Sequence, residues 1–254
     1  GLHTEEDFAD ATAEFVAPIR GRFRGYEVVQ CPPNGSGLIA LMLLGVLDRL
    51  EPAAEPMSAE RWHAAIEAGR LADPAQVEVE VARLLSPDYL AALARMIDPA
   101  RAMRELPPAG MAEILPAHAD TVYLCVVDGE GNACSFINSL FEGFGSGILA
   151  PNSGVMLHNR GFGFRLERGH PNCIAPGKRP MHTIIPGMVM KDGRAVMPYG
   201  VMGGHYQPFG HASVLANMFD HGMDPQQAID APRLFPRSGA VELAFPTPVA
   251  TSDL

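Results

Sequence analysis

The sequence predicts an α+β protein, in which helices and antiparallel strands are segregated along the chain. Most apolar residues before residue 97 recur at helical spacing, whereas from Thr121 onward they form short runs that are typical of strands. Two of the later runs are separated by Asp192-Gly193, a two-residue hairpin signal that indicates antiparallel pairing.

The part of the chain before residue 104 is mainly helical in its pattern. Leu38–Leu50 is apolar nearly all round, which predicts a buried helix, and Tyr26–Cys31 is an expected strand that ends at two prolines. Serine or threonine precedes the other periodic segments, as N-cap residues do. The expected helices are Thr4–Glu14, Leu38–Leu50, a segment after Ser58 that contains Trp62, Ile66 and Leu71, and Pro87–Ile97.

The stretch Arg104–Asp120 carries three prolines and no regular apolar period, so we expect an exposed linker there. It divides the chain into residues 1–120 and 121–254. A helix with Pro208 in its first turn is expected late in the second part, and Gly222 is its expected stop. The strands expected after the linker are Thr121–Asp128, Ala133–Leu140, Gly154–His158, His182–Ile185, Gly187–Lys191 and Ala195–Tyr199.

Composition limits the classes of function that are open to this chain. With 254 residues, 47% of them hydrophobic, it can form one large domain or two small ones. The formal net charge of -10 argues against nucleic acid or an anionic membrane as a partner. No apolar run reaches the length of about 18 residues that a membrane span requires.

The sequence indicates neither a metal nor a cofactor. No two histidines stand four residues apart, and Asn159–Phe164 is no dinucleotide fingerprint because no GxGxxG opens a helix there. The cysteines show no ligand spacing and no clear pairing, so we expect buried, reduced thiols, which favour a cytoplasmic location. They are Cys31, Cys125, Cys134 and Cys173.

Register arithmetic places two hydroxyl residues side by side. If residues 129–131 form a three-residue hairpin loop, Thr121 faces Ser139 at the open end of the hairpin. Directly opposed residues in an antiparallel pair lie about 4.5 to 5.5 Å apart at Cα. The same register puts Cys125 and Cys134 on opposite faces, which argues against a disulfide between them.

Thr121 has two interpretations. It can be an ordinary β-branched strand residue with Ser139 as its polar pair partner. Alternatively, it is an N-terminal nucleophile whose own α-amino group becomes its base once the preceding peptide bond is cut. The second interpretation also explains the abrupt start of the strand pattern and the exposed linker before it.

Five stretches occur in order along the chain: RGYEVVQCPPNGSGLIAL (24–41), TVYLCVVDGEGNACSFINSLFEGFGSGI (121–148), IAPGKRP (174–180), VMGG (201–204) and DAPRL (230–234). Together they resemble the γ-glutamyltranspeptidase family of N-terminal-nucleophile hydrolases. In this resemblance the first stretch is similar to the late part of the large subunit and the others to the small subunit. Several ordered matches are more specific than one motif, and they favour the nucleophile interpretation of Thr121.

The resemblance implies a four-layer αββα sandwich, incomplete at both ends of this chain, and an autocatalytic cut between Asp120 and Thr121. The two cleavage products then stay folded together. Thr121 attacks a small-molecule amide and forms an acyl-enzyme, which water or an amine acceptor releases. The freed α-amine, with an ordinary pKa of about 7.7–8.0, is suited to take the hydroxyl proton.

The resemblance also assigns supporting roles to three residues. Ser139 matches a hydroxyl residue that positions the α-amine, and Gly203 and Gly204 match the glycines of the oxyanion hole. Backbone N–H groups can approach a developing oxyanion closely where no side chain intervenes. Taken without this context, two adjacent glycines would indicate a plain left-handed turn.

The match departs from the family where the substrate is selected. Gly163 stands where the family has an acidic residue that grips the α-amino group of glutamate, and Phe141 replaces an asparagine. We hypothesise that Arg160, with His182 and Thr183 at the positions of two family serines, faces the pocket and binds a substrate carboxylate. A surface ion pair is the alternative role for Arg160.

Three functions follow. The first is hydrolysis or transfer of a γ-glutamyl-like acyl group, as in glutathione metabolism, and the second is a specialised amidase for a small acidic amide such as a glutaryl amide or oxamate. The third is an uncleaved, inactive relative that acts as a binding or structural subunit. It is motivated by the expectation that the chain lacks the early large-subunit region and ends soon after residues 230–234.

Overall fold

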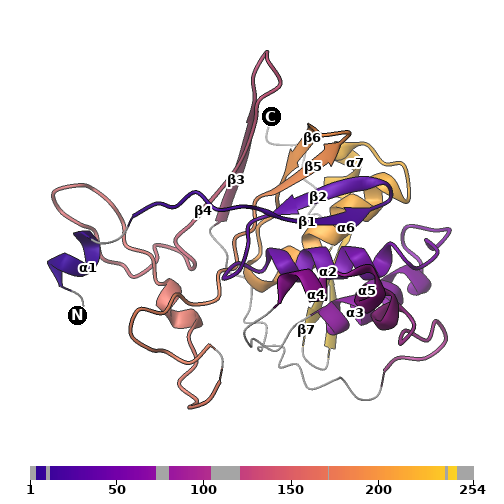
Figure 1. Ribbon diagram of the computed structural model, residues 1–254, viewed down its shortest axis with the longest axis horizontal. Coiled ribbons are helices and arrows are strands. Elements are labelled where there is room, and N and C mark those ends of the chain that lie inside the picture. Colours follow the sequence, from indigo (N-terminus) through magenta and orange to yellow (C-terminus); the bar gives the residue numbers. More distant parts are fainter. Residues whose placement is uncertain are drawn as a thin grey trace, which may run out of the picture.

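The computed structural model describes residues 4–9, 12–72, 80–103, 121–170, 172–237 and 240–244. Helices and antiparallel sheets make up this structure, as the α+β prediction requires (Figure 1). No helix in these ranges is long and apolar enough to cross a membrane. The predicted linker, 104–120, lies outside the described residues, and so does Asp120.

The main sheet contains strands from both parts of the chain. Its order is β1-β2-β5-β6, and all neighbouring strands are antiparallel. At the centre, Val28 of β2 lies opposite Val189 of β5, and both side chains are buried. The strands are β1 (Ile19–Phe23), β2 (Tyr26–Gln30), β5 (Gly187–Lys191) and β6 (Arg194–Tyr199).

Helix α2 (Gly37–Leu47) forms the centre of the core. Nine of its eleven residues are buried, because its apolar side chains point to all sides and contact β1, α3 and α6. The strands of the main sheet and the helices around α2 contribute the rest of the core (Figure 1). These helices are α3 (Ala59–Ala72), α4 (Val81–Leu84), α5 (Pro87–Ala94) and α6 (Gln207–Phe219), and α7 (Pro225–Asp230) packs against α6.

The predicted hairpin turns have the expected geometry. β3 (Thr121–Val127) pairs with β4 (Ala133–Ser139), and Thr121 lies opposite Ser139. Asp192 and Gly193, with φ of 49° and 77°, join β5 to β6 in the left-handed conformation of a tight hairpin. Both registers therefore follow from loop length and residue type.

The cysteine prediction was wrong about burial. Cys31, Cys125 and Cys134 are exposed and Cys173 is half-buried, although all four are free thiols. The β3–β4 hairpin projects away from the helices, so both of its faces are largely open to solvent (Figure 1). The period of a strand predicts which side chains share a face, but it does not say whether anything covers that face.

Two predicted strands were wrong. Gly154–His158 and His182–Ile185 form only single bridges, Leu149 with Met156 and Gly35 with His182, because their backbone groups bond to nearby loops. The first helix is also shorter than predicted. α1 (Glu5–Ala9) has no buried residue, and its first turn is capped by Thr4, whose Oγ1 accepts from the N–H of Asp7.

Several elements were missed. β1 alternates arginines with a glycine and carries little apolar signal, and α7 is short but begins with a complete capping box at Asp224. β7 (Arg233–Arg237) and β8 (Ala240–Ala244) form a separate hairpin near the end of the described chain. These elements are too short for a clear hydrophobic period.

Candidate active site

Thr121 is the first residue of β3 and is only 3% exposed. Its Oγ1 donates a hydrogen bond to Oγ of Ser139, 3.0 Å away. The Ser139 hydroxyl also accepts from the N–H of Phe141 at 2.9 Å. Phe141 has a φ of 82°, so the chain turns sharply after β4 and brings its own amide back onto the serine. The two hydroxyls are thus held in place by the hairpin and by the turn that follows it.

Contacts with β6 hold the hairpin that carries Thr121. The hydroxyls of Tyr123 and Ser135 lie 3.0 Å apart, and the Ser135 hydroxyl donates to the carbonyl of Tyr199 at 3.4 Å. Gly200 lies directly under the ring of Tyr123, because a Cβ built on Gly200 would be 2.4 Å from that ring. Burial raises the pKa of Tyr123 to about 12, so its phenol stays protonated and can donate.

The Gly203-Gly204 turn leads from β6 into α6. Both glycines are left-handed, with φ of 127° and 57°, and a side chain at Gly203 would meet Tyr206 at 2.9 Å. A short 3-10 helix, η2 (Gly204–Tyr206), follows and continues directly into α6. Backbone N–H groups at such a helix start lack partners within the helix and favour an anionic group. This geometry suits stabilisation of an oxyanion.

Arg160 is buried, with 3% of its surface exposed, at the start of the 3-10 helix η1 (Arg160–Gly163). Its Nη1 donates to Oγ1 of Thr183 at 3.0 Å, and its guanidinium lies 5.1 Å from the centre of the Phe141 ring. Its Nη2 is also buried and finds no hydrogen-bond partner among the residues that the structure describes. A surface ion pair is therefore not its role.

His182 lies beside Arg160. Burial, and then the charges of Arg160 and His158, lower the pKa of His182 to about 4, so its imidazole is neutral at neutral pH. Its Nδ1 accepts from the N–H of Ile184 at 3.3 Å, which leaves the proton on Nε2. The structure thus brings together the three residues that were predicted to bind a carboxylate, Arg160, His182 and Thr183.

His205, inside η2, was missed as a site residue. Burial, and then the charges of Arg165 and Arg160, lower its pKa, so it lies within electrostatic range of the Arg160 guanidinium. Its position directly after Gly203-Gly204 is the sequence signal that could have indicated it. Arg160, His182, Thr183 and His205 therefore lie near one another, although they come from three segments that are distant in the sequence.

Phe141 joins the two halves of this arrangement. Its backbone N–H bonds to Ser139, the partner of Thr121, while its ring lies against Arg160. The residue where the sequence departs from the family asparagine therefore connects the hydroxyl pair with the cationic group.

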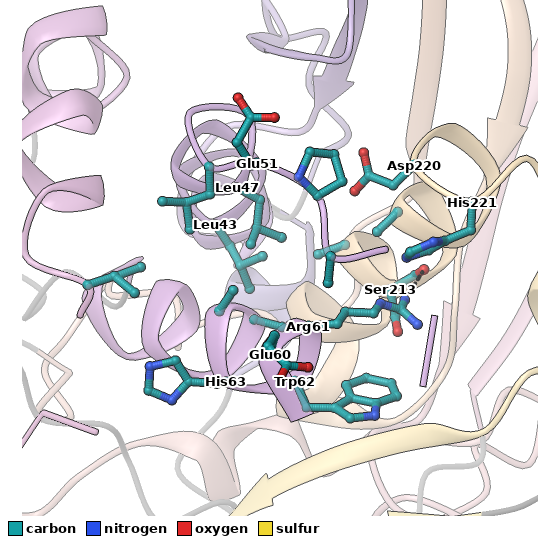
Figure 2. Close-up of a pocket in the computed structure, with 18 of the residues that line it drawn as sticks. Leu43, Leu47, Glu51, Glu60, Arg61, Trp62, His63, Ser213, Asp220 and His221 are labelled. Atoms are coloured by element: carbon teal, nitrogen blue, oxygen red, sulfur yellow. Dashed lines mark hydrogen bonds between the residues drawn. The ribbon is translucent and has the colours of Figure 1, made fainter. Parts of the chain in front are cut away.

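A separate pocket of about 320 Å³ lies between α2, α3 and α6 and contains none of these residues (Figure 2). Leucines and other apolar side chains form most of its wall. Arg61 crosses its base, but its guanidinium already donates to the carbonyls of Pro56 and Ser213 and to Oδ1 of Asn217. The guanidinium of Arg61 is therefore engaged with the protein itself. In the described part of the chain, no cluster of three or more histidine, cysteine, aspartate or glutamate residues is placed to hold a metal ion.

Comparison with known proteins gives consistent matches. The family model described as Gamma-glutamyltranspeptidase matches residues 1–251. The Glutathione hydrolase-like YwrD proenzyme of Bacillus subtilis is 38% identical over 240 residues, which are 91% of this chain and 44% of that protein. The Oxamate amidohydrolase proenzyme of Klebsiella pneumoniae is 38% identical over 211 residues, 79% of this chain and 38% of that protein.

A solved structure agrees with these sequence matches. The crystal structure of cephalosporin acylase from Bacillus halodurans superimposes with a TM-score of 0.81 at 40% identity, covering 92% of this chain and 43% of that one. The chain thus spans less than half the length of each of these three proteins.

Proposed function

The chain belongs to the gamma-glutamyltranspeptidase family, and from this premise we propose that it contains the nucleophile, Thr121, of an N-terminal-nucleophile amidohydrolase or acyltransferase. The observation that carries the proposal is the buried pair of Thr121 and Ser139, whose hydroxyls lie 3.0 Å apart at the start of a strand. We also propose that the protein forms the four-layer αββα sandwich that the resemblance implies.

Maturation precedes the reaction: water hydrolyses the peptide bond between Asp120 and Thr121, which leaves a carboxylate on Asp120, frees the α-amine of Thr121 and divides residues 1–120 from 121–254. The α-amine then takes the proton of Oγ1 while Oγ1 attacks the amide carbonyl of the substrate. The carbonyl oxygen becomes an oxyanion that the backbone N–H groups of the Gly203-Gly204 turn stabilise. The intermediate expels the leaving amine, which takes that proton, and an ester remains on Thr121.

Water or an acceptor amine releases the acyl group by the same steps in reverse. Ser139 keeps Oγ1 oriented throughout and is in turn held by the N–H of Phe141. The site needs no further cofactor for this sequence of steps, because the nucleophile, the base and the oxyanion donors all come from the chain.

We further propose that the acyl group carries a carboxylate, which binds the buried Nη2 of Arg160. Thr183 holds the guanidinium in place, and neutral His182 can donate from Nε2 to the same carboxylate. Gly163 offers no carboxylate to an α-amino group, so a glutaryl-like or oxamate-like acyl group suits the site better than γ-glutamyl. The name of the Klebsiella relative, an oxamate amidohydrolase, agrees with this preference.

Replacing the nucleophile tests the proposal. Thr121→Ala removes the only oxygen of the side chain, so we expect one unsplit polypeptide by intact-mass measurement and loss of turnover by at least about a thousandfold. Thr121→Ser keeps a hydroxyl and should retain both scission and measurable turnover. A Thr121→Ala protein that is still cut and active would contradict the proposal.

Intact-mass measurement of the wild type also tests the alternative of an uncleaved, inactive relative. Wild-type protein that stays unsplit after long incubation would identify it as a binding or structural relative. Two pieces that meet at Asp120 and Thr121, together with turnover of glutaryl p-nitroanilide, γ-glutamyl p-nitroanilide or oxamate, would establish the enzyme and rank its substrates.

A further inference from the structure

The proposed carboxylate site and the Gly203-Gly204 turn belong to different parts of the chain, so contacts between these parts determine the distance between them. The segment that carries the carboxylate site is held first by the turn before α2. The N–H of Ser36 donates to the carbonyl of His182 at 2.9 Å, and the N–H of His182 donates to the carbonyl of Asn34 at 2.8 Å. Neither bond involves the glycine turn.

Gln207 connects this segment with the Gly203-Gly204 turn. Gln207 is the first residue of α6 and directly follows η2, so it is rigidly attached to the glycine turn. Its Oε1 accepts a hydrogen bond from the backbone N–H of Ile185 at 3.2 Å, and Ile185 is two residues beyond Thr183. This bond therefore joins the helix start to the segment that carries the carboxylate site.

The surroundings of Gln207 do not otherwise call for an amide. The residue is 0% exposed, and its neighbours in space and sequence include the buried side chains of Ile185, Pro208 and Phe209. Its Nε2 has no hydrogen-bond partner in the part of the chain that the structure describes. A buried amide with an unpaired donor costs stability, so the contact that favours glutamine here is the bond from Ile185, which an apolar side chain of the same length would leave without an acceptor.

We propose that Gln207 is a positioning residue that sets the distance between the carboxylate site, Arg160 with Thr183, and the oxyanion turn at Gly203-Gly204. The inference rests on the proposed function and deepens it. The length of the glutamine side chain determines how far the carboxylate of the substrate lies from the carbonyl that Thr121 attacks. Gln207 thereby selects the length of the acyl group without touching it.

The experiment compares an acidic and a neutral substrate of equal reactivity. Glutaryl p-nitroanilide presents a carboxylate to Arg160, whereas butyryl p-nitroanilide uses only Thr121 and the oxyanion turn. The measured quantity is the ratio of kcat/KM for the first substrate to kcat/KM for the second. Gln207→Met removes the acceptor oxygen but keeps the length of the side chain. Gln207→Asn shortens the side chain by one methylene and so moves the acceptor oxygen away from the N–H of Ile185.

We expect this ratio to fall about tenfold or more in Gln207→Met and Gln207→Asn, because a displacement of about 1 Å in a bound group can cost up to a hundredfold in rate. Butyryl p-nitroanilide should be cleaved within about threefold of the wild-type kcat/KM. Gln207→Glu keeps an acceptor oxygen at the same distance and should restore most of the ratio. Circular dichroism shows whether each variant folds. If only one of Gln207→Met and Gln207→Asn folds, that variant alone still tests the inference.

Gln30→Met is the matched control. Gln30 is an equally buried glutamine whose amide hydrogen-bonds to Tyr199 and, like Gln207, touches α6, at His211, but it bonds to no described residue of the segment 182–185. Its variant should lose stability and leave the ratio unchanged. An unchanged ratio in the Gln207 loss variants, or an equal fall in Gln30→Met, would overturn the inference. If the wild type cleaves neither substrate faster than Thr121→Ala does, the proposed function itself is refuted.

Discussion

At the scale of single residues, the site combines an ordinary hydroxyl pair with an unusual cation. Thr121 and Ser139 are neutral and hydrogen-bonded to each other, so nothing in their side chains alone makes a nucleophile. Arg160 is buried without an acidic partner in the described residues, and desolvation lowers its pKa. A buried arginine with an open donor is costly unless an anion completes it.

Replacement of Arg160 should therefore affect only substrates with a carboxylate. A hydrogen bond to a charged group contributes about 1.5–3 kcal/mol, so Arg160→Met should lower kcat/KM for glutaryl p-nitroanilide by about ten- to a hundredfold. Butyryl p-nitroanilide should be cleaved at nearly the wild-type rate. Arg22→Met, an exposed arginine of β1, is the control. Equal losses in the two variants would remove Arg160 from the site.

Buried histidines make stability depend on pH. His211 lies wholly within the core, and burial lowers its pKa to about 3 from an ordinary 6.5. Between these two pH values the unfolded chain binds a proton that the folded chain does not bind, so the free energy of unfolding falls as the pH falls through this range. Above pH 6.5 the contribution is complete.

Urea unfolding from pH 7 to pH 4 measures this effect. One such histidine contributes at most about 1.4 kcal/mol per pH unit, and His182 adds to it until the pH reaches its own lowered pKa. His211→Gln should flatten the dependence even if it lowers stability at pH 7. Parallel curves for His211→Gln and the wild type would show that His211 titrates normally in the folded protein.

At the scale of elements, the position of Thr121 depends on how the β3–β4 hairpin rests on β6. The contact includes Tyr123 over Gly200, the residue after β6, and the hydrogen bond from Ser135 to the carbonyl of Tyr199. The same strand β6 leads into the Gly203-Gly204 turn. The proposed nucleophile and the proposed oxyanion donors are thus both connected to one strand.

Gly200→Ala should disturb this placement. The new methyl would lie 2.4 Å from the Tyr123 ring, closer than any real contact, so the hairpin must shift. We expect slower scission by intact mass and about tenfold lower turnover, with a loss of about 1–3 kcal/mol of stability. Gly129→Ala adds the same methyl at the open tip of this hairpin and should behave as the wild type. Wild-type scission in Gly200→Ala would show that this contact does not position Thr121.

At the scale of the whole molecule, the two expected cleavage products share one sheet and one core. β2 from before the cut pairs with β5 from after it, and α2 packs against α6. Separation would expose the paired strands and the apolar side chains between them, which is strongly unfavourable in water.

The two pieces should therefore stay together after scission. In size-exclusion chromatography without denaturant, we expect both to elute in one peak, and to separate only in guanidinium chloride. The Thr121→Ala protein supplies the unsplit reference. Separate elution in native buffer would mean that the shared sheet does not hold the products together.

Some of this architecture could be predicted because it is local. The facing of Thr121 and Ser139 follows from a three-residue loop and the two-residue period of a strand. The buried helix α2 and the turn at Asp192-Gly193 likewise follow from neighbouring residues. The segment His182–Ile185 was wrongly predicted as a strand because its apolar residues suit one, while the backbone partners of His182 lie in the turn before α2, far away in the sequence.

The sequence by itself determined the hairpin that presents Thr121, the longer helices of the core (α2, α3, α5 and α6) and the family of the chain, since each depends on short-range pattern or on ordered motifs. Only the tertiary structure decided that Arg160 is buried on Thr183, that Phe141 lies between it and the hydroxyl pair, and that Gln207 reaches Ile185. The reason is physical: these contacts join loops that lack a period of their own, and such loops are placed by the packing of segments far apart in the chain.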